Sequence, residues 1–135
     1  MLDDDALLEG FENGTIPAGE FHHAEHVRVA WMYLRRYPLP DALARFIAAL
    51  KRFAAGHGVP GLYHETITIA FVLVIAERLD GGSQLSWTDF AAKNPDLLTW
   101  KPSVLATYYT DEVLASERAR RSFVMPDRIL RVRGS

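Results

Sequence analysis

Residues 65–79 read ETITIAFVLVIAERL, and this stretch decides the fold class because it can form either a helix or a strand. The β-branched residues between Thr66 and Ile75 suit a strand. Two features favour a helix: the apolar pattern spans more than a dozen residues, and it ends in Ala76-Glu77-Arg78-Leu79. The chain offers no second segment of comparable strand character for pairing. We therefore expect an all-α protein in which a helix over 61–79, apolar nearly all round, is the central and most buried one.

Three further helices are expected before this segment, over 2–12, 20–37 and 40–55. The first begins with acidic residues, which suit the positive end of a helix dipole. The second places apolar residues on one face and arginines, among them Arg28, on the other. The third has the most regular apolar stripe, formed by Leu43, Phe46, Ile47, Leu50 and Phe53. Together with the helix over 61–79, these segments predict a compact bundle with a four-helix core.

The last third of the chain is expected to form several short helices separated by prolines. Ser86 is the expected N-cap of a helix over 87–92, and Thr110 is the expected N-cap of a helix over 111–123. Residues 127–135 are expected to form a loose basic tail.

Length and composition limit the class of protein. The chain has 135 residues, a formal net charge of −2 and no cysteine. Its length predicts a single domain over residues 1–135. The lack of cysteine excludes disulfides, thiolate nucleophiles and zinc sites with sulfur ligands. The acidic start does not resemble a secretory signal, so we expect a cytoplasmic protein. The longest apolar stretch, Ile67 to Ala76, is about half of the ~20 residues that span a bilayer, so no membrane association is expected.

Charge is distributed unevenly along the chain. Residues 1–20 contain six acidic residues and no basic one, whereas residues 115–135 contain six arginines. Neither a helix-turn-helix pattern nor a basic overall charge accompanies these arginines, so no nucleic-acid partner is expected. We interpret them as a solvated helix face followed by a basic tail. They are Arg118, Arg120, Arg121, Arg128, Arg131 and Arg133.

Two histidine clusters, each near the start of a predicted helix, are the best functional lead. The first contains His22, His23 and His26, and the second contains His64 followed by Glu65. Helices two apart in an up-down bundle run in the same direction, so both clusters are expected at the same end of the molecule. His23 and His26 lie three residues apart and share one helix face. Burying His64 and Glu65 in an apolar helix requires partners, which we expect these histidines to supply.

The first functional hypothesis is a metal site with His23, His26 and His64 as ligands and His22 as an alternate. Glu65 would be a further ligand or, with His64, a catalytic acid/base group. Such a donor set suits Zn²⁺, Fe²⁺, Mn²⁺, Ni²⁺ or Cu²⁺, and sequence does not choose among them. The chemistry would be metal-assisted hydrolysis or redox chemistry on a small molecule. Tyr63 and Thr68 are expected as outer hydrogen-bond partners, although a helical threonine more often bonds the carbonyl four residues earlier.

Two other hypotheses remain open. In one of them the protein is metal-free and uses the same histidines and Glu65 for proton transfer, or binds a small ligand, in an aromatic-lined pocket. Alternatively it is a non-catalytic interaction module whose apolar helices form a homodimer. His57, between two glycines, is expected to be an exposed loop residue. The aromatic residues suit either a pocket or, more often, a core with polar tips at the surface. They are Trp31, Tyr33, Trp87, Trp100, Tyr108 and Tyr109.

Overall fold

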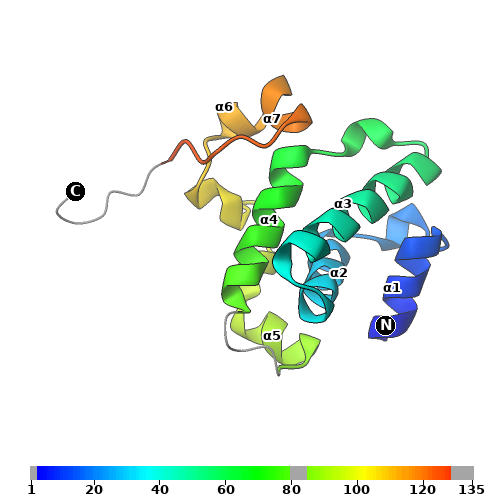
Figure 1. Ribbon diagram of the computed structural model, residues 1–135. Helices are drawn as coiled ribbons and strands as arrows, with labels where there is room; N and C mark the ends of the chain where they lie inside the picture. Colours follow the sequence, from blue (N-terminus) through cyan, green and yellow to red (C-terminus); the bar gives the residue numbers. More distant parts are fainter. Residues whose placement is uncertain (1–2, 80–84, 129–135) are drawn as a thin grey trace.

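The computed structural model describes residues 3–79 and 85–128, and within them the regular secondary structure is helical, which confirms the all-α class (Figure 1). The α-helices are α1 (Asp4–Asn13), α2 (His23–Arg36), α3 (Leu39–Gly56), α4 (Glu65–Arg78), α5 (Trp87–Lys93), α6 (Asp111–Leu114) and α7 (Glu117–Arg121). Short 3₁₀ helices are η1 (Ala18–Glu20), η2 (Pro60–Leu62), η3 (Pro95–Leu98) and η4 (Val104–Thr107). Among the described residues, no helix is both long and apolar enough to cross a membrane.

The segment that decided the fold class is helix α4, and its threonines show why β-branched residues are tolerated there. Thr68 Oγ1 donates to the carbonyl of His64 at 2.7 Å, within the helix itself. Thr66 is fully buried, and its hydroxyl both donates to the carbonyl of Ser122 at 2.8 Å and accepts from the backbone N–H of Val124 at 3.1 Å. Each hydroxyl is therefore paired, so burying it carries little desolvation penalty.

Helices α2 and α4 both begin later than expected, and this places a histidine at the N-cap of each. The chain before α2 forms the separate turn η1, and His22 then takes the extended N-cap conformation. The chain before α4 forms η2, and His64 is the N-cap, with its side chain accepting the backbone N–H of Ile67. The two clusters therefore lie in the first turns of their helices.

Helix α2, rather than α4, is the central helix. It packs against α1, α3 and α4, and its residues from Val27 to Tyr33 are all buried. The prediction that α4 is the most buried helix is wrong. Leu73 on its outer face is 38% exposed. Arg28, expected on a solvated face, is buried because its Nε and Nη2 atoms both donate to Oδ1 of Asp4 in α1.

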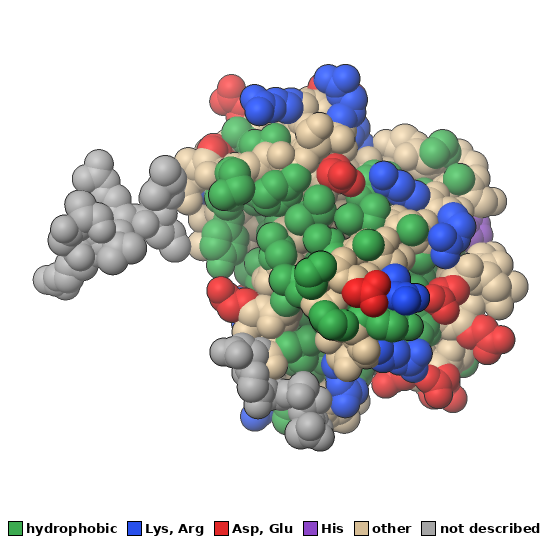
Figure 2. All heavy atoms as spheres, in the orientation of Figure 1, with side chains coloured by type: hydrophobic (Ala, Val, Ile, Leu, Met, Phe, Trp, Pro, Cys, Tyr) green, Lys and Arg blue, Asp and Glu red, His purple; other side chains and the backbone are tan. Residues whose placement is uncertain are grey.

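The aromatic residues divide between core and surface. Trp31 is fully buried and packs against Trp87 of α5, while Tyr33 and Tyr109 are buried with their hydroxyls bonded to a carboxylate and a carbonyl. Trp100, in contrast, is 46% exposed. Figure 2 shows that hydrophobic side chains gather over the middle of the face around α4, with most charged side chains towards its margins.

The C-terminal region contains two short helices where one was expected. Ser86 and Thr110 cap α5 and α6 as predicted. The helix expected over 111–123 is instead divided into α6 and α7, because the hydroxyl of Ser116 caps α7 by accepting the N–H of Ala119 at 3.1 Å. Asp127 bonds the backbone and side chain of Thr110, so the start of the expected tail belongs to the fold. The rest of that tail, residues 129–135, lies outside the described residues.

Candidate functional site

A cavity of about 620 Å³ lies between α2, α3 and α4 and is closed on one side by the η2 segment. Most of its lining is apolar and includes the rings of Phe21, Phe46, Phe53 and Phe71. Its polar lining residues are His23, His26, Tyr63, His64, Thr68 and Arg120. A cavity of this size with few polar groups has the usual character of a small-molecule site.

His26 faces this cavity without a hydrogen-bond partner. Its ring packs on that of Phe21, with 4.3 Å between the ring centroids. Neither ring nitrogen is hydrogen-bonded to any residue that the structure describes. Desolvation, with a smaller contribution from the nearby His23, lowers the pKa of His26 to about 4. The imidazole is therefore neutral at pH 7 and presents one donor and one acceptor nitrogen.

His23 lies on the same helix face and has one nitrogen engaged. Its Nε2 is 2.8 Å from the carbonyl oxygen of Leu97 in η3. Because a carbonyl only accepts, Nε2 carries the proton and Nδ1 is the acceptor in the neutral ring. The ring contacts both Phe71 and Trp100, each at a centroid distance of 5.0 Å, and these two rings also stack on each other at 6.2 Å. Desolvation outweighs the hydrogen bond to Leu97, and the pKa of His23 is lowered.

His64 lines the cavity, but the backbone occupies both of its nitrogens. Nδ1 accepts the N–H of Ile67 at 3.1 Å, and Nε2 donates to the carbonyl of Leu114 at 2.7 Å. The partners that we expected from His23 and His26 are therefore supplied by backbone groups of α4 and α6. This arrangement fixes the tautomer of His64 and makes it a connection between the two helices.

Glu65 is paired with Tyr63 rather than with a histidine. The Tyr63 hydroxyl donates to Oε1 of Glu65 at 2.5 Å. Desolvation of the phenol and this hydrogen bond both raise the pKa of Tyr63, so the hydroxyl keeps its proton at neutral pH. Thr68 bonds the carbonyl of His64, which is the alternative expected for a helical threonine. Neither Tyr63 nor Thr68 donates to the His64 ring.

The two remaining histidines lie outside the cavity lining. His22 is exposed, with its Nδ1 3.3 Å from Oε1 of Glu25. His57 is not the exposed loop residue that we expected. Its ring packs on Phe53 at 4.4 Å, and its Nε2 is buried without a partner among the described residues.

Three histidines thus reach one cavity, but the described residues do not assemble them into a metal-binding set. No group of three histidine, aspartate or glutamate side chains within residues 3–79 and 85–128 is placed to hold one ion. Ligation through His64 would also require one of its two hydrogen bonds to break. The three-histidine metal site therefore stays a prediction from spacing.

Sequence reasoning placed Arg120 on a solvated face, but it lines the cavity together with Trp100, one of the aromatic residues that suited either a pocket or a core. Arg120 belongs to α7 and lies more than fifty residues after the start of α4 in the sequence. No local residue spacing therefore predicts that it lines the cavity. Trp100 is brought there by the turn that its backbone forms with Ser103. No protein-family profile, no curated protein and no solved structure matches this chain.

Proposed function

We propose that this protein binds a small, largely apolar molecule in the cavity between α2, α3 and α4, with His26 as its principal polar contact. The observation that carries the proposal is the neutral, unbonded imidazole of His26 at the wall of an apolar cavity of about 620 Å³. The His26 ring is half-buried and offers a donor and an acceptor nitrogen to a bound molecule. A polar group of the ligand gains a hydrogen bond there, and its apolar part gains free energy from leaving water.

The protonation state of His26 favours binding over proton transfer. A general base works best when its pKa lies near the operating pH. The pKa of His26, about 4, is well below neutrality, so the ring is a weak base there. As a neutral hydrogen-bonding group it suits a hydroxyl, carbonyl or amide on the ligand. Such a polar contact in a mostly apolar wall sets the orientation of the ligand, while the apolar lining supplies most of the affinity.

The apolar dye N-phenyl-1-naphthylamine, whose fluorescence rises in apolar surroundings, tests whether the cavity accepts a ligand. Ala54 of α3 lines the cavity, whereas Ala48 on the same helix is exposed. Ala54→Phe should fill part of the cavity and weaken dye binding at least about tenfold. Ala48→Phe adds the same ring outside the cavity and should leave dye binding unchanged.

Thermal unfolding followed by circular dichroism shows whether both variants keep the fold. No saturable dye binding to the wild-type protein would overturn the proposal. Equal binding to the wild-type protein and to folded Ala54→Phe would also overturn it, because the dye would then bind elsewhere.

A further inference from the structure

Arg120 stands at the edge of the cavity with its charge unpaired. Its Nη1 donates to the carbonyl of Gly61 at 2.9 Å, which holds the guanidinium beside the η2 segment. No carboxylate oxygen of a described residue lies within 4.0 Å of it. Five other arginines each pair with an acidic side chain: Arg28, Arg36, Arg45, Arg78 and Arg121.

The free edge of the Arg120 guanidinium is the one that suits a carboxylate. With Nη1 engaged by Gly61, the Nε and Nη2 groups have no partner among the described residues. The same edge of Arg28 holds the partly exposed Asp4, with Nε at 2.9 Å and Nη2 at 2.5 Å both donating to its Oδ1. The two N–H groups of this edge match the planar geometry of a carboxylate.

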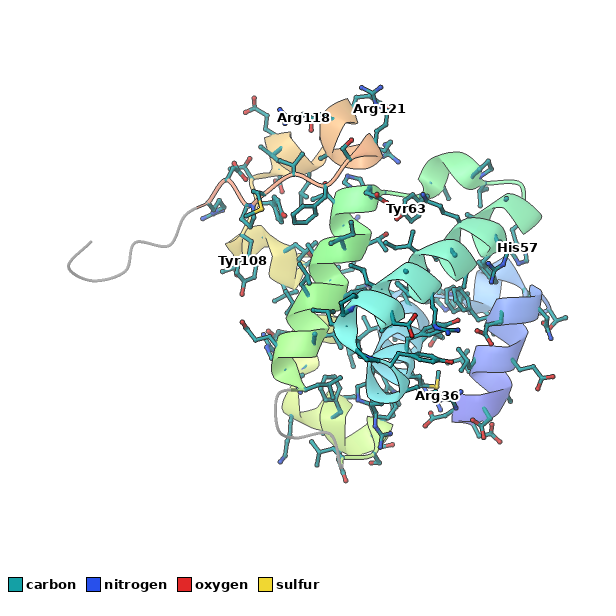
Figure 3. All side chains as sticks on the ribbon, in the orientation of Figure 1. Arg36, His57, Tyr63, Tyr108, Arg118 and Arg121 are labelled. Carbon is teal, nitrogen blue, oxygen red and sulfur yellow. The ribbon has the colours of Figure 1, made fainter. Side chains whose placement is uncertain are left out.

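A second cation lies at the same end of the cavity. Lys51 of α3 places its Nζ 5.0 Å from the ring centroid of Tyr63, and none of the described residues forms an ion pair with it. Figure 3 shows Tyr63 near the start of α4, and Figure 2 shows basic side chains at the top of the molecule, over α7. Two acids also lie at this end: Glu117 pairs with Arg121, whereas Glu65 accepts the Tyr63 hydroxyl and forms no ion pair with a described residue.

The apolar surface continues from the cavity to this cationic edge. Leu62 and Val59 line the cavity and are 73% and 39% exposed, respectively. Ile67, in the first turn of α4, and Phe71 continue the apolar lining. A bound molecule would therefore meet hydrocarbon along its length and positive charge at one end.

We propose that the ligand is an apolar carboxylate whose hydrocarbon part occupies the cavity and whose carboxylate binds Arg120, with Lys51 adding attraction. This inference rests on the proposed function, since it names the class of molecule that the same cavity takes. The guanidinium is exposed, so water and salt weaken the ion pair, and its effect on affinity is moderate. The main effect of this ion pair is that the protein binds an acid more tightly than the uncharged analogue of that acid.

Displacement of N-phenyl-1-naphthylamine by decanoate and by 1-decanol tests this inference, because the two probes share an apolar chain and differ in the head group. The wild-type protein should bind decanoate about tenfold more tightly than 1-decanol. Arg120→Gln should abolish that preference, measured as the ratio of the two affinities in the same variant. Arg118→Gln, which removes an exposed arginine from the same helix outside the cavity lining, is the matched control and should keep the preference.

The outcomes separate this inference from the proposed function. If 1-decanol binds and decanoate shows no advantage, the cavity binds ligands but the carboxylate assignment is wrong. An Arg120→Gln variant that keeps the full preference for decanoate would overturn the assignment as well. If neither compound displaces the dye and neither binds directly in calorimetry, the proposed function fails and this inference fails with it.

Discussion

Nε2 of His64 lies 2.7 Å from the carbonyl oxygen of Leu114, which joins the start of α4 to the end of α6 across fifty residues of sequence. The other nitrogen, Nδ1, accepts the N–H of Ile67 and caps α4. One histidine therefore performs two structural tasks with the two nitrogens of a single neutral tautomer. Removing the ring leaves the carbonyl of Leu114 and the N-terminus of α4 without their partners.

His64→Ala should lower the free energy of unfolding by about 2–3 kcal/mol, because it removes both the cap and the partner of Leu114. His64→Asn keeps a capping oxygen but is too short to reach Leu114, so it should recover about 1 kcal/mol of that loss. Urea unfolding of the three proteins measures both differences. Equal stability of the wild-type protein and His64→Ala would show that neither hydrogen bond matters for the fold.

The hydroxyl of Thr66 holds the C-terminal segment against α4 through Ser122 and Val124. Thr66→Val keeps the shape of the side chain but leaves two backbone groups unpaired, and it should destabilise the protein by about 2–4 kcal/mol. Thr66→Ser retains the hydroxyl and loses one methyl group, so its cost should be about 1 kcal/mol. Equilibrium unfolding ranks the two variants, and a valine variant more stable than the serine variant would contradict the assignment.

His26 makes stability depend on pH in a defined direction. Its pKa is about 4 in the folded protein and about 6.5 in an unfolded chain. Between these values the unfolded chain binds a proton that the folded protein does not bind, so the free energy of unfolding falls as the pH drops from about 6.5 to about 4. The loss from His26 is at most about 3 kcal/mol. The lowered pKa of His23 acts with the same sign.

His26→Phe should remove the His26 contribution to this pH dependence. At pH 7 the variant should match the stability of the wild-type protein to within about 1 kcal/mol, since the ring that it replaces is half-buried and hydrogen-bonded to no described residue. Urea unfolding at about pH 7 and about pH 4.5 compares it with the wild-type protein. The same loss of stability in both proteins between these pH values would show that His26 is not the group responsible.

The metal hypothesis and the hydrogen bonds of His64 make different predictions for one variant. With His23, His26 and His64 as ligands, about one equivalent of a transition metal should co-purify, and His64→Asn should remove it. Because both nitrogens of His64 are engaged, we expect His64→Asn to leave the metal content equal to that of the wild-type protein. Inductively coupled plasma mass spectrometry of tag-free protein, with and without added metal salts, measures it. Stoichiometric metal that is lost in His64→Asn would restore the three-histidine site.

Local signals in the sequence were sufficient for the helical class and for several helix starts. Ser86 and Thr110 cap their helices through bonds to an N–H three residues on, a range that sequence reasoning covers. The break between α6 and α7 is also local, but Ser116 stands within a continuous helical pattern and gave no separate signal. Capping chemistry alone did not distinguish a helix start from a residue in mid-helix.

Long-range partners account for what sequence reasoning missed. Arg28 was assigned to a solvated face because Asp4, its ion-pair partner, lies twenty-four residues away on another helix. The co-location of His26 and His64 at one cavity followed from helix direction and was expected. The hydrogen bond between His64 and Leu114 depends on how α6 packs, and the position of Arg120 at the cavity depends on how α7 packs. Residue spacing within the histidine clusters specifies neither.

The central claim is that His26 contacts a ligand inside the cavity, and long-range ¹H–¹⁵N NMR of the histidine rings tests it most directly. Spectra at pH 7 are recorded with and without saturating 1-naphthol, an apolar probe with a single hydroxyl. We predict that the ring nitrogens of His26 shift on binding, while those of His22, exposed and outside the cavity, stay unchanged. Saturable 1-naphthol binding with an unchanged His26 spectrum, or the lack of any saturable binding, would contradict the account.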